Sequence, residues 1–251
     1  MDELELLVAL HGGADRQGPG STAATSRALE LSGLMDRRGL RIADIGCGTG
    51  ASSLVLARVL DARIEAVDMI PQFLATLRER ADAAGLAGRI HTHEQAMESL
   101  DFKPRSLDAI WSEGAIYNMG FAAGCAAWRE LLKDGGVLAV SELTWLTGQR
   151  PQALEAHWYS QYPQVDTAAA KLRVLEDSGF SPLGYFVLPV SCWLDNYYTP
   201  LRERFEAFLE GQGHSDLARS LVAAEEAEIA LYERYADYFG YGCYIARRVS
   251  G

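Results

Sequence analysis

The sequence predicts an α/β fold in which a mostly parallel sheet of seven strands carries helices on both faces. Short β-like runs of apolar residues alternate with helical stretches from residue 39 onwards, and turn residues bound each run. Parallel neighbours in a sheet need such helices as crossover connections. A glycine-rich loop directly follows the first run. The chain has 251 residues, 49% of them hydrophobic, which is enough to bury one sizeable core as a single domain.

The elements follow one another in a regular order over residues 1–251. Residues 1–38 form an N-terminal arm, residues 39–143 the core, and residues 144–165 and 191–238 two insertions that we expect to cover a substrate site. Strands are predicted at LRIADIG, RIEAVD, RIHTHE, LDAIWS, VLAVSEL, GYFVLPV and YGCYIARRV, and helices at ASSLVLARVL, PQFLATLRERADAAG, AAGCAAWRELLKDGG and TAAAKLRVLEDSGF.

Composition narrows the class of protein. The chain has 23 basic and 34 acidic residues, a net charge of −11, and no run of Lys and Arg, which disfavours nucleic acid as a partner. Its acidic start does not resemble a secretory signal, and no apolar run reaches the roughly 18 residues of a membrane helix, so we expect a cytoplasmic protein with no membrane partner. The four cysteines lack CxxC spacing, and His91 and His93 have no third ligand at a suitable spacing, so we expect no metal.

The segment IADIGCGTGAS, residues 42–52, places Gly46, Gly48 and Gly50 at alternate positions between a strand and a helix. Glycines allow positive φ and close approach of a ligand, and the following helix directs free N–H groups and a positive dipole end at that ligand. An anion is therefore expected there. A dinucleotide pyrophosphate and a small carboxylate both qualify. Asp44 favours the carboxylate of a ligand that also carries a cation, because Asp44 would repel a pyrophosphate.

ADIGCGTG resembles the first motif of class I S-adenosylmethionine-dependent methyltransferases, and the resemblance extends from about residue 15 to residue 247. It implies a Rossmann-like sheet whose last strand is antiparallel, with S-adenosylmethionine as cofactor and S-adenosylhomocysteine as product. RQGPGS, WSEGAIYNMGF and GGVLAVSE together resemble a bacterial subgroup that methylates small molecules. The expected function is therefore transfer of a methyl group to a small-molecule acceptor by in-line displacement.

The resemblance also implies which residues bind the cofactor. Asp68, at the end of the second strand, would accept both ribose hydroxyls, and Met69 would lie against adenine. Gln95 stands where the family usually has an aspartate that binds the adenine amino group, and a glutamine can accept that hydrogen bond too. The full expected set is Ser21, Asp44, Gly46, Cys47, Gly48, Asp68, Met69, Gln95, Ala96, Met97 and Ser112, with Arg16 as an alternative to Ser21.

The acceptor site is expected beyond the carboxyl ends of the strands, where open α/β sheets bind ligands. Tyr117 and Asn118 follow the fourth strand, and Trp193 and Asp195 follow the sixth; these four are the expected substrate-binding residues. Three candidates could remove a proton from the acceptor: Glu113, Tyr117 and His157. An acidic protein with aromatic insertions favours an acceptor that is neutral or cationic.

Alternatives remain open for several of these assignments. Asp68 could only cap a turn, Asp44 could be a buried strand-end hydrogen-bonding group, and the aromatic residues could be helix-packing core. At the level of function, a non-catalytic S-adenosylmethionine-binding protein or an NAD-dependent oxidoreductase would share the glycine loop. The sequence leaves the atom methylated and the oligomeric state open, a homodimer included.

Overall fold

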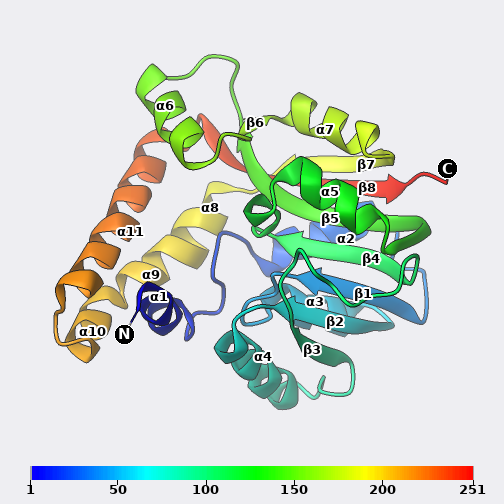
Figure 1. Ribbon diagram of the computed structural model, residues 1–251, viewed down its shortest axis with the longest axis horizontal. Coiled ribbons are helices and arrows are strands. Elements are labelled where there is room, and N and C mark those ends of the chain that lie inside the picture. Colours follow the sequence, from blue (N-terminus) through cyan, green and yellow to red (C-terminus); the bar gives the residue numbers. More distant parts are fainter. Residues whose placement is uncertain (1, 251) are drawn as a thin grey trace.

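The computed structural model describes residues 2–250, which form one sheet with helices on both sides (Figure 1). The strand order is β3-β2-β1-β4-β5-β8-β7, and a two-residue strand, β6, pairs with the end of β5. All pairings are parallel except those of β8 with β5 and β7. The strands are β1 Leu40–Ile45, β2 Ala62–Asp68, β3 Ile90–Glu94, β4 Leu107–Glu113, β5 Leu132–Trp145, β6 Asp166–Thr167, β7 Phe180–Val187 and β8 Phe239–Arg248.

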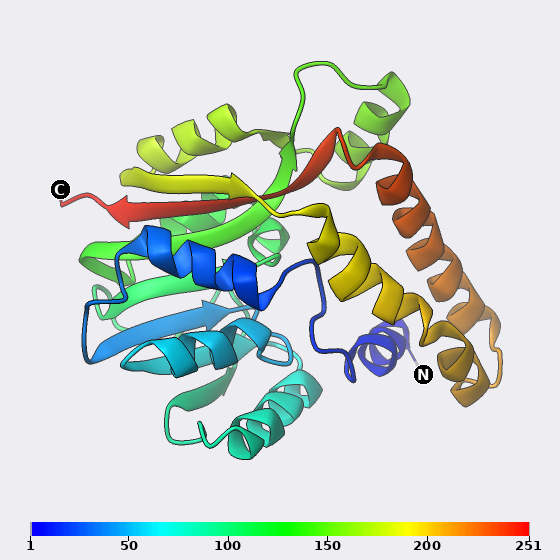
Figure 2. The same cartoon turned by 180° about the vertical axis from the view of Figure 1, so that it is seen from behind.

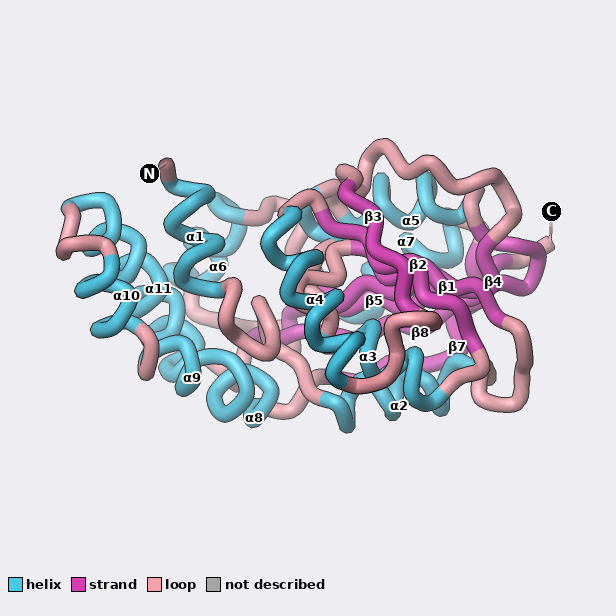
Figure 3. The backbone as a smooth tube through the Cα atoms, turned by 90° about the horizontal axis from the view of Figure 1, so that it is seen from below, coloured by secondary structure: helices cyan, strands magenta, loops and turns pink. Residues whose placement is uncertain are grey.

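Two hydrophobic layers cover the two faces of the sheet. Side chains alternate across a strand, so Ile42 of β1 joins one layer and its neighbour Ala43 joins the other. One face packs against α2 Thr22–Ser32, α3 Ala51–Val59 and α4 Pro71–Ala83, and the opposite face packs against α5 Phe121–Arg129 and α7 Ala168–Asp177 (Figures 2 and 3).

The remaining helices form a separate layer beyond the carboxyl ends of the parallel strands, which we call the cap (Figure 1). The first helix of the N-terminal arm packs against α10 and α11, so the two ends of the sequence build this layer together. The cap consists of α1 Glu3–His11, α6 Gln152–Gln161, α8 Val190–Trp193, the π-helical turn η2 Leu194–Tyr198, α9 Thr199–Arg202, α10 Phe205–Gly211 and α11 Asp216–Tyr235. A 3₁₀ turn, η1 Ile116–Asn118, follows β4.

The fold predicted from the sequence is confirmed, including its seven strands and the antiparallel last one. Several boundaries were wrong. The helix predicted at AAGCAAWRELLKDGG is too long, because α5 ends at Arg129 and β5 begins at Leu132. β5 continues to Trp145 because Thr144 and Trp145 pair with Gly240 and Phe239 of β8, so the first insertion begins later than residue 144. β7 begins at Phe180, four residues before the predicted run, because its first residues pair with the end of β8. The short strand β6 was not predicted.

Candidate functional site

The glycine loop between β1 and α3 is tied to the neighbouring strand β2. The amides of Gly46 and Cys47 both donate to the carbonyl of Val67, at 2.9 and 3.0 Å. All three loop glycines have positive φ. A Cβ at Gly46 would lie 2.4 Å from the Cβ of Ala115, so the loop after β4 packs too closely for any other residue there. Glycine at this position therefore serves close packing of two loops as well as ligand approach.

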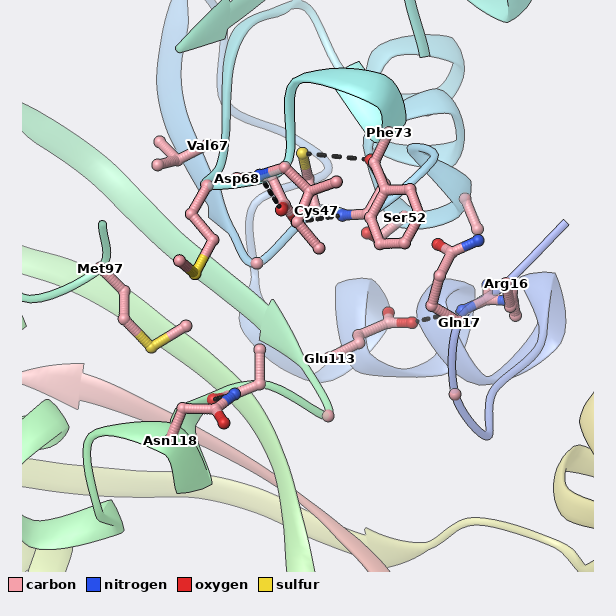
Figure 4. A pocket seen from close by; sticks show the side chains of 18 of the residues that line it. Arg16, Gln17, Cys47, Ser52, Val67, Asp68, Phe73, Met97, Glu113 and Asn118 are labelled. Carbon is pink, nitrogen blue, oxygen red and sulfur yellow. Dashed lines mark hydrogen bonds and ion pairs between the residues drawn. The ribbon is translucent and has the colours of Figure 1, made fainter. Parts of the chain in front are cut away.

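Asp68 connects the end of β2 to the glycine loop (Figure 4). One carboxylate oxygen accepts from the amide of Gly48 at 2.9 Å, and the other accepts from the amide of Ile70 at 3.0 Å. Burial raises the pKa of Asp68, although these backbone donors oppose the rise. The capping role that the sequence left open is thus present, and the same side chain also lines a cavity.

A cavity of about 370 Å³ opens above the loop. Seven of the residues predicted to bind a cofactor line it: Gly46, Cys47, Gly48, Asp68, Met69, Gln95 and Met97. Met69 is 64% exposed, so its side chain offers a free apolar surface there. The wall also contains residues that the sequence did not single out, notably Gln17, Ile70, Phe73 and Glu98.

Gln17, from the N-terminal arm, lies directly over the glycine loop. Its side-chain oxygen accepts from the amide of Thr49 at 2.9 Å, and its amide group donates to the carbonyls of His11 and Ala14. The expectation that a ligand anion would take the free N–H groups at the start of α3 is therefore not met for Thr49, because the arm already provides the acceptor. The segment RQGPGS signalled an arm at the site, but nothing in it indicated this particular contact.

Arg16 and Glu113 join the arm to the end of β4 (Figure 4). Arg16 Nη1 lies 2.7 Å from Glu113 Oε2, while the hydroxyl of Thr25 and the indole N–H of Trp111 donate to Glu113 Oε1 at 2.7 and 2.9 Å. Glu113 lines the cavity, but three donors engage its carboxylate. We therefore correct its expected role: it anchors the arm and is not a free proton acceptor.

Four predicted cofactor-binding residues do not line this cavity. Asp44 is fully buried beneath the loop, where it accepts from the hydroxyls of Ser52 and Ser53 at 2.7 and 2.6 Å, so it holds the start of α3 and does not face a ligand. Burial raises its pKa to about 6. Ser21 caps α2 by accepting from the amide of Ala24.

The other two are Ser112 and Ala96. Ser112 lies in β4, and its side chain is fully buried. Because side chains alternate across a strand, it points to a covered face of the sheet. Ala96 lies next to Gln95 but contributes nothing to the wall.

A second cavity of about 660 Å³ lies between the first one and the cap. Its wall is formed by the arm, the loop after β4, and helices α1, α6 and α11 with η2. The aromatic side chains in this wall are Phe73, Tyr117, Trp158, Tyr162, Trp193, Tyr197 and Tyr241. Glu225 and Glu228 supply its carboxylates and His11 its imidazole; the sequence predicted none of these three. The sequence signal for the two glutamates is the acidic face of α11, a pattern that is also typical of a solvent-exposed helix face.

The two cavities share part of their walls. Residues 17–19 of the arm, Ile70, Phe73, Gly114, Tyr117 and Asn118 line both. Tyr117 is 43% exposed, and its ring meets that of Tyr162 edge-on at 6.2 Å. The predicted substrate-binding residues Tyr117 and Asn118 therefore lie at the junction between the cavities.

The remaining predicted residues differ in position. His157 is exposed on α6 and lines neither cavity, so the structure does not support it as a proton acceptor. Asp195 is also exposed and lies on the outer side of η2, away from both cavities. Trp193 lines the second cavity but is only 3% exposed and stacks on Tyr232 at 4.4 Å, which makes it mainly a packing residue.

Comparison with known proteins agrees with this geometry. Residues 42–136, from β1 to the start of the paired part of β5, match a family model described as a methyltransferase domain. Over these residues the chain is similar to a methyltransferase domain. A ubiquinone biosynthesis O-methyltransferase of Methylocella silvestris is 32% identical over 109 residues, which are 42% of this chain and 40% of that protein.

Two solved structures show how widely this methyltransferase fold is used. A SAM-dependent methyltransferase from Thiobacillus denitrificans, in complex with S-adenosyl-L-homocysteine, has a TM-score of 0.83 at 19% identity, over 98% of this chain and 99% of that one. The [4+2]-cyclase SpnF has a TM-score of 0.77 at 22% identity, over 99% and 93%. The first curated relatives are matched over a quarter to a half of their own length, so in them the similarity is confined to part of the protein.

Two further features bear on possible partners of this protein. Within residues 2–250, no helix combines the length and the apolar character needed to cross a bilayer. In the same part of the chain, no three His, Cys, Asp or Glu side chains gather as metal ligands would. His93 instead forms a 2.7 Å hydrogen bond with Glu65.

Proposed function

We propose that this protein transfers the methyl group of S-adenosylmethionine to a small-molecule acceptor. One observation carries the proposal: the cavity above the glycine loop and the cavity under the cap share a wall, so a donor in one and an acceptor in the other would meet at Tyr117 and Asn118. The similar structure from Thiobacillus denitrificans supports this donor, since it is a complex with S-adenosyl-L-homocysteine.

The residues of the first cavity fit this cofactor. Asp68 would accept the ribose hydroxyls, because each of its oxygens has one backbone donor and retains capacity for another. Met69 would lie against adenine, with Gln95 and Met97 beside it. Gln95 now exchanges hydrogen bonds with Asp101, at 3.3 and 3.5 Å, and these long contacts can yield to a ligand.

S-adenosylmethionine supplies an activated sulfonium methyl, so the protein's task is mostly to position two reactants. Holding them in line can contribute on the order of 7–11 kcal/mol to lowering the barrier. The arm and the cap would exclude water, because Gln17, Gly18 and Pro19 lie across the junction. Of the three expected proton acceptors, only Tyr117 lines both cavities without a competing ion pair. We therefore keep Tyr117 as the candidate proton acceptor at the junction of the two cavities.

The structure weighs against the NAD-dependent alternative. A pyrophosphate would need the loop amides of Gly48 and Thr49, and these already donate to Asp68 and Gln17. A ligand with a ribose and no pyrophosphate fits this arrangement better.

Calorimetric titration with S-adenosylhomocysteine, S-adenosylmethionine and NAD tests the proposal, followed by an acceptor screen with a labelled methyl donor. We expect S-adenosylhomocysteine to bind and NAD not to bind, and the label to appear in a small-molecule product. Binding of NAD alone would overturn the proposal. If the cofactor binds and a substrate is converted without gaining or losing carbon, the chemistry would instead be of the kind named for the cyclase SpnF.

A further inference from the structure

We propose that the acceptor is a small molecule that carries an ammonium group, and that Glu225, Glu228 and the aromatic rings around them hold this group as a cation in the second cavity. This inference rests on the proposed function and assigns a substrate class to the cavity under the cap. It is carried by the chemistry of the wall, described below from its carboxylates, its rings and one unpartnered imidazole nitrogen.

The two carboxylates come from one face of α11. Glu225 and Glu228 are three residues apart, which places them side by side on a helix, and both line the cavity. The side chain of Glu225 is 13% exposed, whereas Glu228 is exposed and accepts from the hydroxyl of Tyr198 at 2.9 Å. Their two negative charges, one turn apart on the helix, repel each other. A cation between them would relieve this repulsion.

The basic group beside these carboxylates is the His11 imidazole, which contacts Glu225. Among the described residues, not one Lys or Arg contributes to the wall, and the hydrogen bond that Glu228 accepts comes from a tyrosine hydroxyl. The ion pairs of α11 with arginine lie elsewhere: Glu226 and Glu233 bind Arg202. The cavity is therefore acidic. An acceptor with a phosphate or carboxylate near these glutamates would be repelled.

Aromatic rings complete a site of the kind that binds ammonium groups. Tyr197 and Tyr241 line the cavity together with Tyr117 and Trp158. The negative face of an aromatic ring attracts a cation by about 0.5–2 kcal/mol, more when the cation is removed from water. Rings combined with carboxylates can therefore bind a cation while discriminating against a neutral molecule of the same shape.

His11 adds an independent observation. It is 7% exposed and lines the cavity, and its Nε2 lies 3.1 Å from Glu225 Oε1. An ionised carboxylate can only accept, so Nε2 carries a proton, and in the neutral form of the ring Nδ1 is then left as an acceptor. This buried Nδ1 has no partner among the described residues. An N–H group of a protonated amine in the cavity would supply the missing donor.

The test uses pairs of ligands that differ only in charge. Choline and 3,3-dimethylbutan-1-ol have the same shape, as do acetylcholine and 3,3-dimethylbutyl acetate. The full chain is first titrated with S-adenosylhomocysteine and then, at saturation with it, with each of the four compounds. We expect at least one ammonium compound to bind ten times more tightly than its neutral counterpart.

Three variants locate the site. Glu225→Gln and Glu228→Gln should each weaken ammonium binding at least fivefold and leave the neutral compounds unchanged. Glu226→Gln, on the same helix but bound to Arg202 outside the cavity, is the matched control and should keep wild-type affinity. Melting temperatures show whether Glu225→Gln also loosens α1, since Glu225 bonds His11; Glu228→Gln does not have that complication.

The outcomes separate the two proposals. If S-adenosylhomocysteine binds but neither ammonium compound is preferred over its neutral counterpart, the amine assignment is wrong and the donor site stands. A preference that survives both Glu225→Gln and Glu228→Gln also overturns the assignment, because the cation would then lie elsewhere. If S-adenosylhomocysteine does not bind, the proposed function fails and this inference fails with it.

Discussion

Arg16 and Glu113 form a 2.7 Å ion pair between the N-terminal arm and the carboxyl end of β4. Their side chains are only 12% and 17% exposed, so solvent screens the pair weakly. The two residues are 97 positions apart in sequence. This contact fixes Gln17, Gly18 and Pro19 across the junction of the two cavities.

Glu113→Gln should weaken both the fold and the cofactor site. The substitution leaves Arg16 without its anion while keeping an acceptor for Thr25 and Trp111, and removing one partner of a buried pair costs about 3–5 kcal/mol. We expect that loss in chemical denaturation and a fall of about three- to tenfold in affinity for S-adenosylhomocysteine. Glu130→Gln, which removes an exposed ion pair with Arg129, should change neither. Equal effects of the two substitutions would exclude the anchoring role.

Gly48→Ala should destabilise the glycine loop by displacing the side chain of Gln17. This effect adds to any loss of ligand binding. Gly48 has φ of +54°, and a Cβ there would lie 2.2 Å from Gln17 Oε1. The left-handed conformation costs about 1–2 kcal/mol for a residue with a Cβ, and displacement of Gln17 adds to it. Gly85→Ala is the control, because Gly85 has φ of +69° and open space around it.

A double variant separates the two contributions. If Gln17→Ala is combined with Gly48→Ala, the contact is removed and the stability loss should be smaller than the sum of the single losses. Additive losses in thermal unfolding would show that Gln17 adjusts without cost.

Asp68→Ala should reduce affinity for S-adenosylhomocysteine by roughly 2–4 kcal/mol, because the ribose hydroxyls lose a charged acceptor. The structure adds that the amides of Gly48 and Ile70 lose their acceptor too, so a modest fall in melting temperature should accompany the change. Asp61→Ala is a matched control, since Asp61 likewise accepts a backbone amide, that of Gly39, but lies outside both cavities. Calorimetry with unchanged affinity for Asp68→Ala would leave Asp68 with its turn-capping role only.

Asp44→Asn should change how stability depends on pH. The folded protein holds the pKa of Asp44 at about 6, above its ordinary value of 3.8, so the folded state binds this proton more tightly than the unfolded state. Stability should therefore fall as pH rises from about 4 to about 6, by about 3 kcal/mol for this group. The variant should lack that fall. Denaturation curves at pH 4, 5, 6 and 7 check it, and parallel curves for variant and wild type would contradict the expectation.

Tyr117→Ala and Trp193→Ala should behave differently, although both were expected to contact the acceptor. Tyr117 is 43% exposed at the cavity junction, so its truncation should lower turnover of a methyl acceptor while affinity for S-adenosylhomocysteine stays within about threefold. Trp193 is buried against Tyr232, and its truncation should cost about 3–5 kcal/mol of stability. Steady-state kinetics and melting temperatures distinguish the two; a stable Trp193→Ala protein would show that the stacking contributes little.

The core of the fold was predictable because its signals are local. Alternation of apolar residues indicated each strand of the sheet, and the spacing of Gly46, Gly48 and Gly50 indicated the loop and the cavity above it. Asp68, Met69 and Gln95 were implied by the resemblance to class I methyltransferases, and all three line that cavity.

The remaining site residues depend on contacts between distant segments. Nothing local to Gln17 indicates that it meets Thr49, and nothing local to His11 indicates that it meets Glu225, 214 positions away. Asp44 was misassigned for a related reason: its position suggested a ligand, but the side chain points under the loop, where Ser52 and Ser53 provide donors that only the folded helix brings within reach.

The separation of the two cavities has a consequence for how such enzymes diversify. The matched methyltransferase domain ends at residue 136, and the wall of the second cavity comes largely from segments outside it, namely α1, α6, η2 and α11. Mutations that reshape those segments leave Asp68 and the glycine loop untouched. Under the proposed function, the donor site can thus be kept while the surrounding helices change. The protein can then take new acceptors with little effect on donor binding.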